Sequence, residues 1–146
     1  MNTVEQTAAY LTLLERDKRF KLASYEFINE VAERAAMSGI GEFKETESED
    51  DDETEPDVGV HVTGQQMCRV AVVHAVEQYG LMARITLDNL GFHTTEDIGD
   101  AVYNMIDVGL MAKTCDDSRE DFDGVFDLGS ELDAEFHFAY RGRRRG

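Results

Sequence analysis

Residues 64–79 predict a helix that is apolar on most of its sides. Only Gln66, Arg69 and Glu77 mark a narrow polar face. The apolar positions are Met67, Cys68, Val70, Ala71, Val72, Val73, Ala75 and Val76. A helix that is apolar almost all round must be buried among other elements. We therefore expect the rest of the chain to pack around this segment, which Thr63 is placed to cap.

An acidic run divides the chain before this helix. Residues 42–57 hold ten carboxylates against the single Lys44, and they include the only proline, Pro56. Like charges at this density repel one another and resist compaction. We interpret the run as a solvated linker. The alternative is that it supplies counter-charge to a basic surface, such as the arginine-rich end of the chain.

The spacing of apolar residues predicts a mainly α protein of the α+β class. Residues 1–41 are expected to form a pair of helices, and the second of them begins near Phe20. Thr3 and Gln6 match a capping box at the start of the first helix. The moderate apolar stripe of that helix consists of Val4, Ala8 and Leu11, followed by Leu14 or Glu15.

Residues 58–129 follow the order of a winged helix, which is three helices and then a strand, a loop and a strand. The two strands are expected at 110–114 and 125–128, as a short β-hairpin around an acidic wing, 115–124. Residues 130–146 predict a C-terminal helix with an Arg-rich tail. We expect these segments to form one compact domain, since 146 residues suffice for a single core.

The helix at the recognition position of this unit has the wrong charge for DNA. Residues 94–109 contain four carboxylates and no lysine or arginine. A helix that enters a DNA groove meets a dense row of phosphates, which would repel this one. Specific duplex DNA is therefore not an expected partner. The segment also carries a clear amphipathic stripe, made of Ile98, Ala101, Val102, Met105 and Ile106.

Several short motifs occur in order along the chain. They are Arg19-Phe20, Tyr25-Glu26-Phe27-Ile28, His61-Val62-Thr63-Gly64-Gln65, Gln78-Tyr79-Gly80-Leu81-Met82-Ala83, Thr95-Glu96-Asp97-Ile98-Gly99, Gly109-Leu110-Met111-Ala112-Lys113 and Asp117-Ser118-Arg119-Glu120-Asp121-Phe122. Together they resemble a small uncharacterised protein family of planctomycete and verrucomicrobial bacteria. The resemblance covers most of residues 16–128, and it departs at Asn89-Leu90-Gly91-Phe92, where Trp-Gly is expected. Because the family has no assigned activity, the resemblance implies an organisation and no catalytic residue.

The net charge of −17 indicates either a basic partner or adaptation of the surface to solubility or a salty cytoplasm. Two cysteines, Cys68 and Cys115, suggest a reducing compartment. The N-terminus shows no signal-peptide pattern, and no apolar run is long enough to span a bilayer. A cytoplasmic protein with no membrane partner is expected.

The leading hypothesis is a non-enzymatic interaction module that binds a basic protein surface through the acidic helix and the wing. Charge complementarity would set the association rate and the choice of partner. The contact residues would be Asp97, Asp100, Asn104 and Asp107 on the helix, with Arg119 and Phe122 on the wing. No catalytic, cofactor or metal site is predicted. The histidines are scattered, and the loop 116–124 has a cation, Arg119, where an EF-hand needs its first oxygen ligand.

Two alternatives remain open at this point. One is a nucleic-acid-associated factor of the ribosome or the transcription machinery. It would contact RNA through a tail composed of Arg141, Arg143, Arg144 and Arg145. The other is a small enzyme of unknown type, for which a deep pocket lined by convergent polar groups would be the sign.

Overall fold

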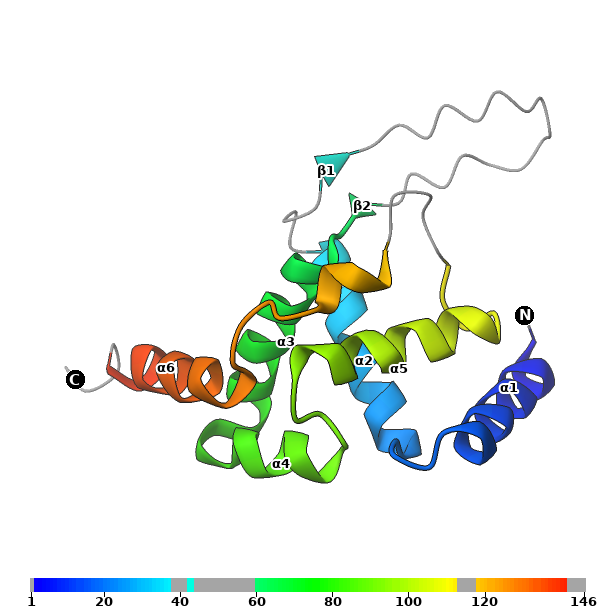
Figure 1. The fold of residues 1–146 in the computed structure, drawn as a ribbon, viewed down its shortest axis with the longest axis horizontal. Coiled ribbons are helices and arrows are strands. Elements are labelled where there is room, and N and C mark those ends of the chain that lie inside the picture. The colour runs from blue at the N-terminus through cyan, green and yellow to red at the C-terminus, as the bar shows by residue number, and fades with distance from the viewer. Residues whose placement is uncertain (1, 38–41, 44–59, 113–117, 142–146) are drawn as a thin grey trace.

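The computed structural model describes residues 2–37, 42–43, 60–112 and 118–141. Six α-helices and one pair of two-residue strands account for most of them (Figure 1). The helices are α1 (Thr3–Arg16), α2 (Leu22–Met37), α3 (Gly64–Tyr79), α4 (Ala83–Asn89), α5 (Thr95–Asp107) and α6 (Leu128–Arg141). The strands β1 (Glu42–Phe43) and β2 (Val60–His61) pair antiparallel. The protein is mainly helical, as the sequence predicts.

Helix α3 lies at the centre of the fold, between α2 and α6 (Figure 1). Its N-cap is Thr63, whose side chain accepts a hydrogen bond from the backbone amide of Gln66, while the Gln66 side-chain oxygen accepts one from the Thr63 backbone amide. The buried positions are Gly64, Met67, Cys68, Val70, Ala71, Val72, His74, Ala75 and Val76. The predicted central helix and its cap are therefore confirmed. The physical reason is that nearly every side of this helix must leave water.

One core joins both sides of the acidic run. Leu13 of α1 and the inner face of α2 pack in the same apolar cluster as α3, α4, α5 and α6. The residues that α2 and the turn before it turn toward the core lie at helical spacing, and they are Phe20, Ser24, Phe27, Val31 and Ala35. Most of the acidic run itself, residues 44–57, lies outside the described residues.

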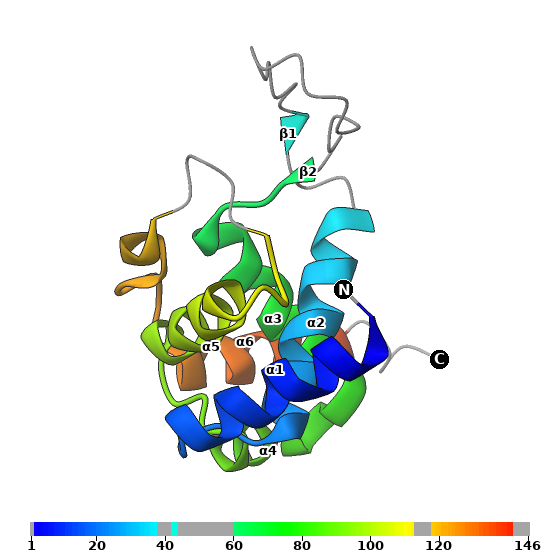
Figure 2. The same cartoon turned by 90° about the vertical axis from the view of Figure 1, so that its right-hand side faces the viewer.

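Helix α1 differs from the sequence prediction in its cap and in its buried face. The N-cap is Asn2, with Glu5 as its capping-box partner, one residue earlier than the predicted Thr3. The helix docks through Leu13 and through Tyr10, whose hydroxyl accepts a hydrogen bond from Asn29 at 2.7 Å. In Figure 2 it lies on the outside of the bundle, in front of α2. Of the predicted stripe, Val4, Ala8 and Leu11 are exposed, while Leu14 is half-buried against the core.

Helix α5 follows the sequence prediction closely. Thr94 is its N-cap and forms a capping box with Asp97. Its buried stripe includes Ile98, Ala101, Val102 and Met105. The preceding α4 ends at Asn89, and Gly91 follows with a positive φ, a common way for a helix to end.

The winged-helix prediction is not supported by the described residues. Residues 125–128 do not form a strand: Arg119–Phe122 is a 3₁₀ turn (η2), and α6 already begins at Leu128. The backbone amides that a hairpin would use are bonded to side chains of α5. Gly124 N–H donates to Glu96 at 2.6 Å, and Val125 N–H donates to Thr95 at 3.3 Å. The other predicted strand, 110–114, has no strand in its described part, 110–112.

Among the helices that the structure describes, none combines the length and apolar character needed to cross a bilayer.

Candidate functional site

The predicted acidic face of α5 is paired within the protein. Arg19, in the turn between α1 and α2, places Nη1 3.0 Å from Asp100 and 3.7 Å from Asp97. Arg119 of η2 contacts the other carboxylate oxygen of Asp100. The side chains of Asp97 and Asp100 are only 19% and 16% exposed. The absence of lysine and arginine from the helix is therefore offset by two arginines from elsewhere in the chain.

A hydrogen-bond network continues from this pair toward the core. Arg19 also bonds Asp17 at 2.8 Å, and the Asn104 amide donates to Asp17 at 3.0 Å and to the Tyr25 hydroxyl at 3.4 Å. Residues 17 and 104 are distant in sequence, so the network ties the α1–α2 turn to the middle of α5. Its geometry indicates a structural clamp between two elements.

The structure pairs several residues of the site prediction with other parts of the chain. Asp97 and Asp100 bond to Arg19, and Asn104 bonds to Asp17 and Tyr25. Phe122 is buried because η2 packs tightly on α5: a Cβ at Gly99 would lie 2.7 Å from the Phe122 Cβ. Of the predicted contact residues, Asp107 is exposed, and Arg119 is exposed while paired with Asp100.

The Asp17 carboxylate should make folding stability depend on pH in the acid range. Its hydrogen bond from Arg19, with a further one from Asn104, lowers its pKa from 3.8 to about 2. A carboxylate whose pKa is lower in the folded state stabilises the fold above its unfolded pKa, and this contribution is lost as the pH falls from 4 toward 2. We expect Asp17→Asn to cost about 2 kcal/mol at neutral pH.

Urea unfolding at a series of pH values measures this effect. The difference between wild type and Asp17→Asn should shrink below pH 4, whereas Glu15→Gln, at an exposed neighbour on α1, should match wild type throughout. A difference that stays constant down to pH 2 would show that the carboxylate charge of Asp17 is not what matters.

The outer face of α2 carries carboxylates that remain exposed. Glu26, Glu30 and Glu33 follow one another at helical spacing along it, and Met37 ends the row. Glu30 and Glu33 line an open hollow together with Arg34, Met37 and His74. This row is a second acidic surface, which sequence analysis missed although its i, i+4, i+7 spacing was visible.

His74 satisfies its ring nitrogens within that hollow. Its Nε2 lies 2.9 Å from a Glu30 oxygen, and its Nδ1 lies 3.4 Å from Nη1 of Arg34. Because a guanidinium can only donate, Nδ1 accepts and the ring proton is on Nε2. Arg34 in turn pairs with Glu77. His74 is therefore held by side chains of α2 on both of its ring nitrogens.

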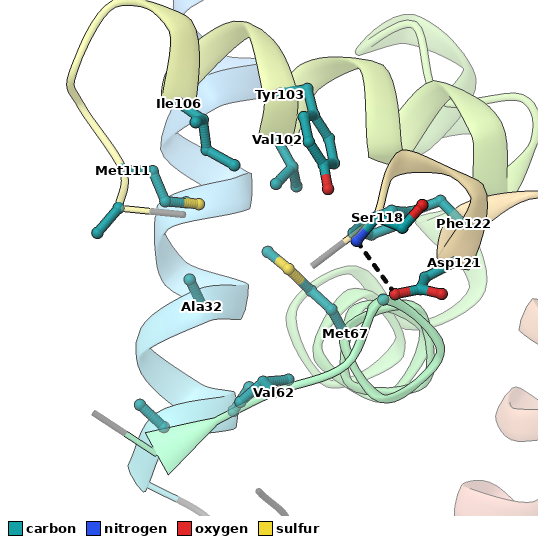
Figure 3. A pocket seen from close by; sticks show the side chains of 14 residues that line it. Ala32, Val62, Met67, Val102, Tyr103, Ile106, Met111, Ser118, Asp121 and Phe122 are labelled. Atoms are coloured by element: carbon teal, nitrogen blue, oxygen red, sulfur yellow. Dashed lines mark hydrogen bonds between the residues drawn. The ribbon is translucent and has the colours of Figure 1, made fainter. Parts of the chain in front are cut away.

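A cavity of about 170 Å³ opens where α2, α3, α5 and η2 meet (Figure 3). Its walls are mostly apolar, and Ser118 and Asp121 of the η2 segment provide polar groups at one end. Its side chains belong to residues far apart in the sequence, and sequence analysis did not find it. The glycines Gly64 and Gly99 were the available signal, because a glycine inside a helical pattern often permits close approach of another segment.

Among the residues that the structure describes, the side chains able to bind a metal are not clustered, and the one cysteine, Cys68, is buried. No group of three or more His, Cys, Asp or Glu side chains is placed to hold a metal ion in this part of the chain. Burial raises the pKa of the Cys68 thiol to about 12, so it is held in the unreactive protonated form. Cys115 and the tail arginines Arg143, Arg144 and Arg145 lie outside the described residues, while Arg141 ends α6 and is exposed.

Comparisons with models of protein families, with curated proteins and with solved structures gave no match to this chain. The resemblance to the planctomycete and verrucomicrobial family therefore stays a prediction.

Proposed function

We propose that this chain is a non-enzymatic interaction module that binds a basic segment of a partner protein. The proposal is carried by the charged side chains that remain at the surface once arginines have paired with carboxylates of the same chain. Arg19, Arg34, Arg69, Arg84 and Arg119 each pair with carboxylates of the chain itself. The row Glu26, Glu30 and Glu33 stays at the surface, and among the described residues His74 and the paired Arg34 are the only basic side chains that line the hollow beside Glu30 and Glu33.

The binding face is accordingly proposed on α2, with Asp107 at the end of α5 as a further contact. Asp97, Asp100 and Asn104 would serve this function indirectly, by holding α5 against the α1–α2 turn. Electrostatic complementarity of this kind raises association rates and discriminates against acidic partners. A role for the Arg141–Arg145 tail in RNA binding stays a prediction, as does an enzymatic activity.

Titration calorimetry with an oligolysine peptide at low salt tests the proposal. We expect Glu26→Gln, Glu30→Gln and Glu33→Gln together to weaken binding about tenfold, since three exposed pairs contribute roughly 1.4 kcal/mol. The matched control removes three exposed carboxylates from other elements, through Glu15→Gln, Asp88→Asn and Asp123→Asn.

The control keeps the same net charge as the α2 variant, so it separates a binding face from general attraction. Equal losses in the two triple variants would show that only net charge matters. Failure of the wild-type protein to bind oligolysine would contradict the proposed function altogether.

A further inference from the structure

The cavity at the junction of α2, α3, α5 and η2 has two chemically different parts. One part is apolar and flexible: the thioethers of Met67 and Met111 face each other across it, with Val102 and Ile106 beside them (Figure 3). Methionine side chains adapt readily to the shape of an occupant. The other part is the η2 end, where Asp121 brings a carboxylate to the lining.

The Asp121 carboxylate differs from those of the α5 network. Asp17, Asp97 and Asp100 each lie within 4 Å of an arginine. Asp121 accepts one long hydrogen bond, from the Ser118 amide at 3.4 Å, and within the described chain no Lys or Arg pairs with it. A half-buried carboxylate with so few partners is a favourable place for a cation.

The volume restricts what the cavity can hold. About 170 Å³ is close to that of an engineered protein cavity that binds benzene, and below the range of most ligand sites. One side chain fits. A neutral apolar side chain would cover the Asp121 carboxylate without pairing it, and an acidic one would be repelled. A side chain with a long apolar stem and a cationic end satisfies both parts.

We propose that this cavity accepts one lysine side chain of the basic partner, with its stem between Met67 and Met111 and its ammonium at Asp121. The inference rests on the proposed function, and it adds the residue type that the partner supplies. Lysine fits better than arginine because its compact ammonium can pair with one carboxylate, whereas the planar guanidinium of arginine presents five donors. The acidic row of Glu26, Glu30 and Glu33 lies on a different face of α2 from the cavity. This row would attract the remaining basic residues of the segment.

Methyl NMR of the methionines tests the cavity directly, with n-butylammonium as the probe because it reproduces the lysine side chain. We expect the methyl signals of Met67 and Met111 to shift on titration, while that of Met82, exposed in the turn before α4, stays in place. The neutral probe n-butanol should bind at least about fivefold more weakly, because one favourable ion pair contributes on the order of 1 kcal/mol.

Two variants complete the experiment. Asp121→Asn keeps a side-chain acceptor for the Ser118 amide and should weaken butylammonium about fivefold, whereas Glu120→Gln, at an exposed neighbour outside the lining, should have no effect. Ala36→Leu, at an exposed position on the cavity wall, should block both probes. Equal binding of the two probes, or no response of Met67 and Met111, would overturn the inference.

The outcome is separable from that of the proposed function. If oligolysine binds but Asp121→Asn leaves its affinity unchanged, the lysine pocket is wrong and the acidic face on α2 stands. If oligolysine does not bind, the proposed function is wrong, and the butylammonium titration still decides whether the cavity takes an alkylammonium group.

Discussion

Gly91→Ala is expected to lower the free energy of unfolding by about 3 to 4 kcal/mol, enough to unfold a marginal domain. Gly91 has a φ of +90°, a conformation that costs an L-residue at least about 1 to 2 kcal/mol. A Cβ at this position would also lie 2.5 Å from the Arg19 carbonyl oxygen and 3.1 Å from the Phe20 ring. The turn that holds the Arg19 clamp would have to move away.

Gly124→Ala provides the matched control. Its φ is also positive, +55°, but nothing lies within 4 Å of the new Cβ. We therefore expect a loss of only about 1 to 2 kcal/mol from the backbone conformation alone. Urea denaturation followed by circular dichroism measures both. Equal losses would mean that the close approach between Gly91 and Arg19 does not exist in solution.

Phe92→Ala is expected to cost about 3 to 5 kcal/mol, the range of a large aromatic removed from a packed core. Phe92 is 1% exposed, and its ring centroid lies 5.4 Å from that of Phe20 and 5.9 Å from that of Phe27. It thereby joins the end of α4 to both the α1–α2 turn and α2. Because the end of α4, the α1–α2 turn and α2 all meet at the Phe92 ring, the cavity that the substitution leaves cannot collapse easily.

Phe138→Ala serves as the control for Phe92→Ala. The Phe138 side chain is 77% exposed on α6, and its removal should change the free energy of unfolding by less than about 0.5 kcal/mol. Thermal and urea unfolding of the two variants should differ sharply. A large loss on removing Phe138 would indicate that this side chain is covered in solution, for example by a second copy of the chain.

Features encoded by neighbouring residues could be predicted from the sequence. The N-cap at Thr63 depends on residues close by in the sequence, and the structure has it. The apolar stripe of α5 depends on helical spacing, and its members Ile98, Ala101, Val102 and Met105 are buried. The central position of α3 followed from its own composition, because a helix without a polar face has nowhere else to be stable.

Features that depend on distant residues could not be predicted in the same way. The spacing of Val4, Ala8 and Leu11 indicated one possible buried face for α1, but the contact between Tyr10 and Asn29 selects another. The predicted wing strands are absent from the described residues for a similar reason. The side chains of Glu96 and Thr95 accept hydrogen bonds from the amides of Gly124 and Val125, which a hairpin would need.

The candidate site shows the same division. The carboxylates of α5 and their spacing were readable from the sequence, but their partner Arg19 is 81 residues away from Asp100. Asp17 and Arg19 were visible only as a polar interruption after the first helix. The residues that line the cavity at Asp121 come from four elements, so no local sequence pattern indicates the cavity.

The order of the helices, the N-cap at Thr63 and the burial of α3 are set by the sequence alone, because backbone hydrogen bonding and hydrophobic periodicity act over a few residues. Which carboxylates remain free for a partner was decided only by the tertiary structure. Ion pairs and cavities form between side chains that the chain brings together after its helices have packed, and their long-range geometry has no counterpart in residue spacing.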